Sequence, residues 1–219
     1  EKFSMSILAV RCSQEVNGVS KLHGEVSREM FTGLWPGYLT EELHIGYVTN
    51  GVHLPTWLGP DWKKLYEKTF GADCFTRQED RVMWDRIKLV PDLEIWSLKS
   101  DEREELINHI KERLAEASNP IMDNPGQMLE IATSLNENAL TIGFARRFAT
   151  YKRAHLLFRD LDRLARIVNN PEKPVQFVFA GKAHPRDMPG QDLIKMIVEI
   201  SKRSEFIGKI VFLQNYDIR

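Results

Sequence analysis

The stretch Val175-Gln176-Phe177-Val178-Phe179-Ala180-Gly181 is apolar at every position but one and ends in a glycine. A continuous apolar run of this length predicts a strand that is buried on both faces. Similar runs at 139–147 and 209–214 predict two more such strands. Between them, 151–169 and 190–204 carry apolar residues at helical spacing. This order predicts a βαβαβ unit with a parallel sheet, which is a Rossmann-like α/β fold.

The two predicted helices each present an apolar face to the sheet. The residues expected on these faces are Leu156, Leu157, Leu161, Leu164 and Ile167 in the first helix, and Leu193, Ile194, Ile197 and Val198 in the second.

The chain before this unit has a different pattern, with mostly helices and loops predicted. Residues 4–33 are predicted to be mostly helical, with an interruption at Asn17-Gly18, and 34–59 to be a loop with one short strand near 45–48. Further helices are predicted at 61–70, 79–89 and 100–117, the last with Ser100 as its cap, and 119–126 is predicted to be a connection.

Composition restricts the class of protein. The 219 residues are 42% hydrophobic and 28% charged, with a formal net charge of -1, so nothing favours nucleic acid or an anionic membrane as a partner. No apolar run approaches the roughly 20 residues that a membrane span needs. The two cysteines, Cys12 and Cys74, build no disulfide framework, and the six histidines show no metal-ligand spacing. We therefore expect a cytoplasmic protein without a metal site.

Both ends of the chain have the pattern of a longer protein. It begins without Met among positions that are typical of buried residues, and it stops at Asp217-Ile218-Arg219 directly after an apolar strand. We expect an internal fragment.

Cations gather where the first predicted strand ends. Arg146, Arg147, Lys152 and Arg153 fall within eight residues at a strand-to-helix junction. Ligands bind beyond the carboxyl ends of parallel strands, and the N-terminus of a following helix favours a phosphate-type dianion there. A solvated basic turn explains the same spacing, so both interpretations stay open.

Other loops offer weaker signals. Gly181-Lys182-Ala183 follows the second strand, where a glycine permits close backbone approach, but no earlier glycine makes it a Walker A loop. Asn17-Gly18 and Asn50-Gly51 are each typical of a turn. The functional alternative is that their amides bind sugar hydroxyls.

Read together, five segments resemble the α-glucan (glycogen, starch or maltodextrin) phosphorylase family, in wording closest to its short prokaryotic branch. The segments are Glu15-Val16-Asn17-Gly18-Val19-Ser20-Lys21-Leu22-His23-Gly24, Thr49-Asn50-Gly51-Val52 with Trp57-Leu58, Arg146-Arg147-Phe148-Ala149-Thr150-Tyr151-Lys152-Arg153, Ala180-Gly181-Lys182-Ala183, and Phe212-Leu213-Gln214-Asn215-Tyr216. The resemblance implies a two-domain GT-B-type glycosyltransferase with a helical N-terminal segment here. Residues 1–55 would end its N-terminal Rossmann-like domain, and 56–219 would begin the C-terminal one.

The resemblance also implies an activity. Family members use inorganic phosphate to release the terminal α-1,4-linked glucose of a glucan as α-glucose 1-phosphate. They depend on pyridoxal 5'-phosphate, whose phosphate group serves as a proton relay. The lysine that anchors this cofactor would lie outside the chain, so we expect the fragment alone to be inactive. The resemblance leaves open a homo-oligomer of the full-length protein.

Carried over position by position, the resemblance gives roles to individual residues. Arg147 and Lys152 match ligands of the substrate phosphate, and Tyr151 a tyrosine beside the glucose and phosphate. The other matches are Arg146 and Tyr216 for the cofactor, and Asn50 and Lys182 for the substrate. Gln14 is also expected to bind the substrate, at a position where it replaces a family histidine.

Three positions depart from the family. Gln14 stands where better-known members have a histidine beside the reacting sugar, Ala149 replaces another histidine, and Asp217 replaces an arginine next to the cofactor. These departures put the sugar contacts in question.

Two other classes remain as alternatives. A nucleotide-sugar glycosyltransferase of the glycogen synthase type also places Arg and Lys on phosphate groups, although the wording of the segments favours a phosphorylase. The second alternative is a non-catalytic glucan-binding module.

Overall fold

The computed structural model describes residues 3–115 and 125–214, and the chain divides into two compact units, Glu1–Trp84 and Asp85–Arg219. The predicted domain boundary near residue 55 concerns the full-length protein and stays a prediction.

The first unit begins with a helix and a small parallel sheet. Helix α1 (Met5–Cys12) is followed by β1 (Val16–Gly18), α2 (Lys21–Phe31) and β2 (Ile45–Tyr47), and β1 pairs with β2 in parallel. Helix α2 packs closely on the sheet, because a Cβ added at Gly18 would lie only 2.4 Å from the backbone nitrogen of Gly24. The predicted interruption of the helix at Asn17-Gly18 is therefore a strand in its own right.

The rest of the first unit is helical and carries an aromatic cluster. The connection 32–44 holds the 3₁₀ turns η1 (Thr32–Leu34) and η2 (Thr40–Glu42), and α3 (Leu54–Trp57), α4 (Pro60–Phe70) and α5 (Arg81–Asp85) follow. The rings of Tyr66, Phe70 and Trp84 meet edge to face, with centroids 4.9–5.6 Å apart. Buried Cys74 and Met83 lie in the same region of the chain.

The second unit is built on a parallel sheet in the order β3-β4-β5, as the sequence predicts. The strands are β3 (Leu140–Ala145), β4 (Val175–Ala180) and β5 (Ile210–Leu213). The helices are α6 (Asp92–Ala115), α7 (Pro125–Ser134), α8 (Leu161–Val168) and α9 (Met188–Ser201), with the 3₁₀ segments η3 (Arg86–Leu89), η4 (Thr150–Lys152) and η5 (Ala154–Phe158).

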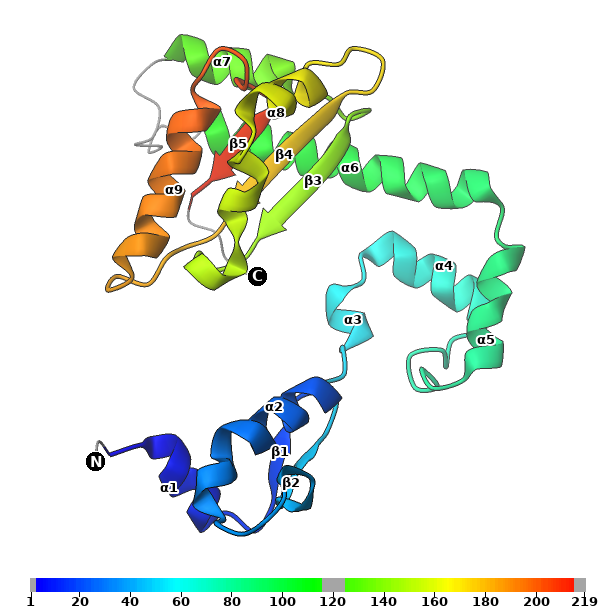
Figure 1. Ribbon diagram of the computed structural model, residues 1–219. Helices are drawn as coiled ribbons and strands as arrows, with labels where there is room; N and C mark the ends of the chain where they lie inside the picture. The colour runs from blue at the N-terminus through cyan, green and yellow to red at the C-terminus, as the bar shows by residue number, and fades with distance from the viewer. Residues whose placement is uncertain (1–2, 116–124, 215–219) are drawn as a thin grey trace. The chain divides into compact units, whose positions relative to one another are not determined.

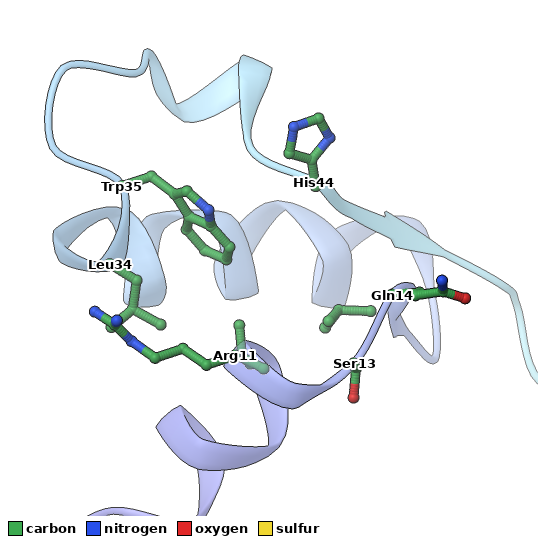
Figure 2. Close-up of a pocket in the computed structure, with 8 residues that line it drawn as sticks. Arg11, Ser13, Gln14, Leu34, Trp35 and His44 are labelled. Atoms are coloured by element: carbon green, nitrogen blue, oxygen red, sulfur yellow. The ribbon is translucent and has the colours of Figure 1, made fainter.

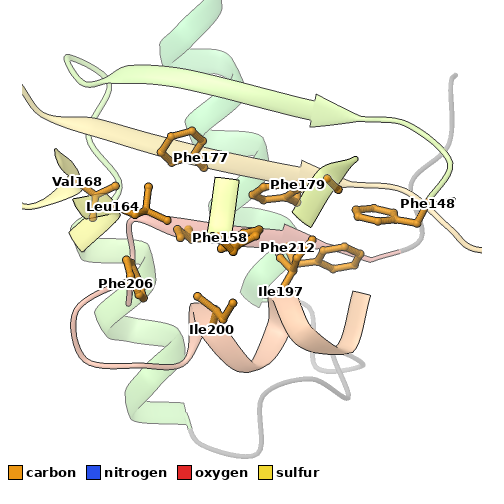
Figure 3. Close-up of a cluster of buried hydrophobic side chains, with 12 residues drawn as sticks. Phe148, Phe158, Leu164, Val168, Phe177, Phe179, Ile197, Ile200, Phe206 and Phe212 are labelled. Carbon is orange, nitrogen blue, oxygen red and sulfur yellow. The ribbon is translucent and has the colours of Figure 1, made fainter. Parts of the chain in front are cut away.

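Alternate side chains of the strands enter two separate cores. Phe177 and Phe179 point to one face of β4, where they pack with residues of η5, α8 and α9 (Figure 3). Val178 points to the other face and packs with α6 and α7, as does Val211 of β5. Helices therefore cover both faces of the sheet (Figure 1). This explains why β4 is a continuous apolar run.

Strand β3 departs from the prediction of full burial. Leu140 and Ile142 are 60% and 43% exposed, whereas Ile210, Val211 and Phe212 of β5, the other outer strand in the order β3-β4-β5, are buried. The apolar composition of a strand does not reveal how far it is covered.

Three helix predictions are also corrected. Helix α6 begins at Asp92 directly after Pro91, and Ser100 lies inside it, where its hydroxyl donates to the carbonyl of Trp96 at 2.9 Å. Helix α7 was not predicted; it starts at Pro125, while most of the predicted connection lies outside the described residues. Residues 151–169 form two 3₁₀ segments and the short α8, and Leu156 and Ile167 are each 44% exposed.

Candidate anion-binding site

The segment after β3 continues alongside the segment after β4. The backbone N–H of Arg146 donates to the carbonyl of Ala180 at 3.1 Å, and that of Phe148 donates to the carbonyl of Lys182 at 2.9 Å. Ala145 pairs with Ala180 in the sheet and Phe148 bridges Ala183 in the same register. The two backbones thus remain paired beyond the carboxyl ends of the strands, which keeps Arg147 level with Lys182.

Gly181 makes this pairing possible. Its φ is +153°, and a Cβ at this position would lie 2.1 Å from the carbonyl oxygen of Arg146. The sequence suggested a glycine that admits a ligand; instead, it admits the backbone of the cationic segment itself.

Phe148 anchors the cationic segment in the core. Its side chain is fully buried, and its ring lies 5.4 Å from that of Phe144 and 5.7 Å from that of Phe212. Its carbonyl faces α9 closely, since a Cβ at Gly190 would lie 2.7 Å from that oxygen. The flanking cations Arg146 and Arg147 are exposed, and their side chains form no hydrogen bond or ion pair with the described residues.

Lys152 and Tyr151 lie on the 3₁₀ turn η4. The ammonium of Lys152 lies 5.2 Å from the centroid of the Tyr151 ring, within the range of a cation–π contact, and Tyr151 is 69% exposed. The expected α-helix N-terminus beside the cations is absent from this segment. Helix α8 begins only at Leu161, and the carboxylate of Asp160 already accepts from the N–H of Arg163 at 2.9 Å. The positive charge of the segment therefore comes from its side chains.

A cleft of about 420 Å³ opens beyond the ends of β4 and β5. Its lining residues are Gly181, Lys182, Ala183, Gln191, Ile194, Lys195, Phe212 and Gln214. Sequence reasoning named Lys182 but missed Gln191 and Lys195 of α9. Lys195 lies 3.2 Å from the carboxylate of Asp192, so it offers the cleft a partly neutralised charge.

The first unit brings the two Asn-Gly segments together. The N–H of Asn50 donates to the carbonyl of Val19 at 3.1 Å, and the N–H of Val48 to that of Gly18 at 2.9 Å. The amide of Asn50 is exposed. Asn50 therefore lies beyond the carboxyl end of the β1–β2 pair, whereas Asn17 lies within β1, opposite Gly46.

Gln14 borders a pocket of about 480 Å³ in the first unit (Figure 2). Leu34, Trp35 and His44 of the connection line this pocket together with Arg11 of α1, and the indole of Trp35 points toward α1. Gln14 is thus exposed in the loop that leads into β1. Tyr216 and Asp217 lie outside the described residues.

Other kinds of site find no support in the described ranges. Within 3–115 and 125–214, no group of three or more His, Cys, Asp or Glu side chains is arranged to hold a metal ion. No helix of these ranges is long and apolar enough to cross a membrane.

The fold and the site together define a class of protein. This is an α/β protein whose parallel sheet carries exposed Arg and Lys side chains beyond its carboxyl edge, the arrangement with which such folds bind anionic ligands. The chain belongs to the carbohydrate phosphorylase family, whose model matches residues 1–219.

Several curated relatives share the whole of this chain. It is 42% identical to the maltodextrin phosphorylase of Thermococcus litoralis, covering 100% of the chain and 26% of that protein. It is 41% identical to the glycogen phosphorylase of Aquifex aeolicus (99% and 31%) and 40% identical to that of Mycobacterium tuberculosis (99% and 25%). The chain therefore spans about a quarter to a third of the length of these relatives.

Proposed function

We propose that the full-length protein carrying this chain is an α-glucan phosphorylase. Inorganic phosphate would cleave the terminal α-1,4-linked glucose of a glucan and give α-glucose 1-phosphate. The observation that carries this proposal is the cationic segment 146–153 at the carboxyl edge of the sheet, in a chain that matches the phosphorylase family throughout. The proposal includes a GT-B-type arrangement, with 1–55 and 56–219 contributing to its two Rossmann-like domains, and a cytoplasmic location.

Arg147 and Lys152 would bind the attacking phosphate. A guanidinium binds phosphate oxygens through two parallel hydrogen bonds, and an ammonium acts as a point charge. Together they would neutralise the dianion and stabilise negative charge against a glucosyl centre that becomes positive in the transition state. Lys182 runs level with Arg147 and would add to the positive potential.

Tyr151 and the first unit would position the sugar. The exposed phenol of Tyr151 next to Lys152 would place a hydroxyl beside the glucose and the phosphate. The exposed amides of Asn50 and Gln14 would offer donors and acceptors to sugar hydroxyls.

Pyridoxal phosphate is the cofactor of this family, and the residues present fit its phosphate group. The exposed guanidinium of Arg146 forms no hydrogen bond or ion pair with the described residues, so it is available to an anion at this edge. Arg146 would hold the cofactor phosphate, with Tyr216 as the proposed contact of the ring. When bound, the cofactor supplies a phosphate group that takes part in proton transfer.

The test uses the full-length protein with maltodextrin or glycogen, pyridoxal phosphate and inorganic phosphate, and follows glucose 1-phosphate. We expect release, with kcat/KM reduced by about 10²–10³-fold in Arg147→Ala and in Lys152→Ala, as for the loss of one transition-state charge contact. The matched controls Arg159→Ala and Lys173→Ala, both exposed, should keep the activity. Glucosyl transfer from a nucleotide-glucose donor without phosphorolysis would instead assign the protein to the synthase-like class, which the relatives do not favour.

A further inference from the structure

Arg153 has an unusual backbone conformation. Its φ and ψ are 58° and 31°, in the left-handed region, and it is the one non-glycine residue with positive φ in the described ranges. This conformation costs an L-residue with a Cβ roughly 1–2 kcal/mol. Such strain persists only where the surrounding structure enforces it, and it gathers at functional sites.

The strained residue separates two 3₁₀ segments. Arg153 ends η4 and precedes η5: its N–H donates to the carbonyl of Thr150, and its own carbonyl accepts from the N–H of Leu156, each at 3.0 Å. The left-handed residue therefore produces the bend directly after Lys152.

Buried anchors on both sides hold the bend in place. Phe148 before it is fully buried, and Ala154 and Phe158 after it are 6% and 8% exposed. All three belong to the same core cluster. The path between the anchors, which includes Tyr151 and Lys152, is thus fixed at both ends by packing.

The side chain of Arg153 does not explain its conformation. The residue is exposed, and its guanidinium forms no hydrogen bond, ion pair or ring contact with the described residues. The distinctive feature of Arg153 is therefore its left-handed backbone, with the two backbone hydrogen bonds that it forms.

We propose that Arg153 is a positioning residue for the phosphate site, acting through its left-handed backbone rather than through its charge. The bend sets the direction in which Lys152 leaves η4, beside the ring of Tyr151. This inference rests on the proposed function, because it takes Lys152 to be a ligand of phosphate.

The experiment compares substitutions that separate backbone from charge in the full-length protein. Glycine and asparagine tolerate the left-handed region, lysine keeps the charge, and β-branched valine is the least tolerant. We expect Arg153→Gly and Arg153→Asn to keep KM for phosphate within about threefold, and Arg153→Val to raise it by ~5–10-fold. KM for maltodextrin should stay unchanged in all of them. Arg159→Val is the matched control, since Arg159 is also exposed but has a φ of -68°.

Two further measurements exclude a general loss of structure. Unfolding midpoints of each variant report global stability. In a Lys152→Ala background, Arg153→Val and Arg153→Gly should differ in KM for phosphate by less than about twofold, because the residue to be positioned is gone.

The outcomes are distinguishable from a failure of the proposed function. If the parent releases no glucose 1-phosphate, that function fails, and calorimetric binding of inorganic phosphate by the same variants decides the role of Arg153. Weak binding by the glycine and asparagine variants, with normal binding by Arg153→Lys, would assign the role to the charge and overturn the inference. Equal binding by the valine and glycine variants, or no phosphate binding by the parent, would overturn it as well.

Discussion

Gly181 shows how one residue without a side chain fixes the position of several charged ones. The carbonyl oxygen of Arg146 lies so close to Gly181 that a Cβ added to this residue would be only 2.1 Å from it. Its φ of +153° is also unfavourable for other residues. Because the nearest atoms to this Cβ are the backbone oxygen and carbon of Arg146, no change of side-chain rotamer can relieve the contact.

We therefore predict that Gly181→Ala moves the cationic segment away from the end of β4. In the full-length protein, kcat/KM for phosphate should fall at least about tenfold, and unfolding should become easier by ~1–3 kcal/mol. Gly51→Ala provides the control, because no atom lies within 4 Å of a Cβ at that position. Steady-state kinetics and urea unfolding check both effects. An alanine variant with the kinetics of the parent would show that the close approach is unnecessary.

Cys74 gives a prediction about pH. Burial, and to a smaller extent the charge of Glu67, raises the pKa of its thiol above the ordinary value of 9.0. The folded state therefore favours the protonated thiol, and the associated stability is present below pH 9.0 and is lost as pH rises through the folded pKa. Exposed Cys12 should react with a thiol reagent at pH 8, whereas Cys74 should react only on unfolding.

The measurement is the free energy of unfolding between about pH 7 and pH 10 in the parent and in Cys74→Ala. The parent should lose stability at the alkaline end more steeply than the variant. Parallel curves would contradict a raised pKa of this thiol, whichever variant is the more stable.

At the scale of elements, α9 connects the sheet to the site. Its N-cap is Asp187, whose carboxylate accepts from the N–H of Gly190 at 3.0 Å, and Gly190 lies against the carbonyl of Phe148. The cap thus holds the first turn of the helix where it contacts the cationic segment. The same helix contributes Gln191 and Lys195 to the cleft.

We predict that Asp187→Ala destabilises the protein by about 1 kcal/mol, the usual cost of a lost N-cap. Asp192→Ala on the same helix is the control, because its exposed pair with Lys195 contributes little. Equilibrium unfolding in urea compares the two. A loss in Asp192→Ala as large as in Asp187→Ala would mean that helix charge, rather than capping, is responsible.

The elements show what sequence patterns can and cannot predict. All three strands of the larger sheet are predicted by their apolar runs. Burial on two faces explains the runs of β4 and β5, whereas β3 has the same apolar composition and is largely exposed. The helix predicted over 151–169 is wrong because the anchoring of Phe148 and Phe158 in one core, with a left-handed residue between them, overrides the helical periodicity. Helix α6 starts at Asp92, directly after Pro91. A proline near the first helical position is a helix start signal, but the prediction placed the start at Ser100.

The candidate site divides in the same way. Arg146, Arg147 and Lys152 are close in sequence, so their spacing indicates either an anion site or a solvated basic turn, and the sequence pattern leaves both interpretations open. Gln191 and Lys195 join the cleft only through the packing of α9 on the segment after β3, which no local pattern reports. One sequence feature could have indicated them: both residues lie in the first two turns of the helix that follows β4 and the Lys182 loop.

At the scale of the whole molecule, charge is balanced overall and concentrated locally. Thirty basic and thirty-one acidic residues give a formal net charge of -1, so we expect no general affinity for polyanions. Arg146, Arg147 and Lys182 are nevertheless all exposed on paired segments at one edge of the sheet. Salt screens the attraction between a few exposed cations and a bound anion, whereas it has little effect on the binding of a neutral sugar.

We therefore predict that phosphate binding by the full-length protein weakens several-fold when NaCl is raised from about 0.1 M to about 1 M, because the screening length falls from ~10 Å to ~3 Å. Binding of uncharged maltodextrin serves as the internal control and should remain constant. Arg147→Ala should show a shallower salt dependence, since it removes one of the screened charges, and duplex DNA should not bind at about 0.1 M salt. Isothermal titration calorimetry measures all three ligands. Phosphate binding that is independent of salt would mean that buried groups, rather than these exposed side chains, hold the anion.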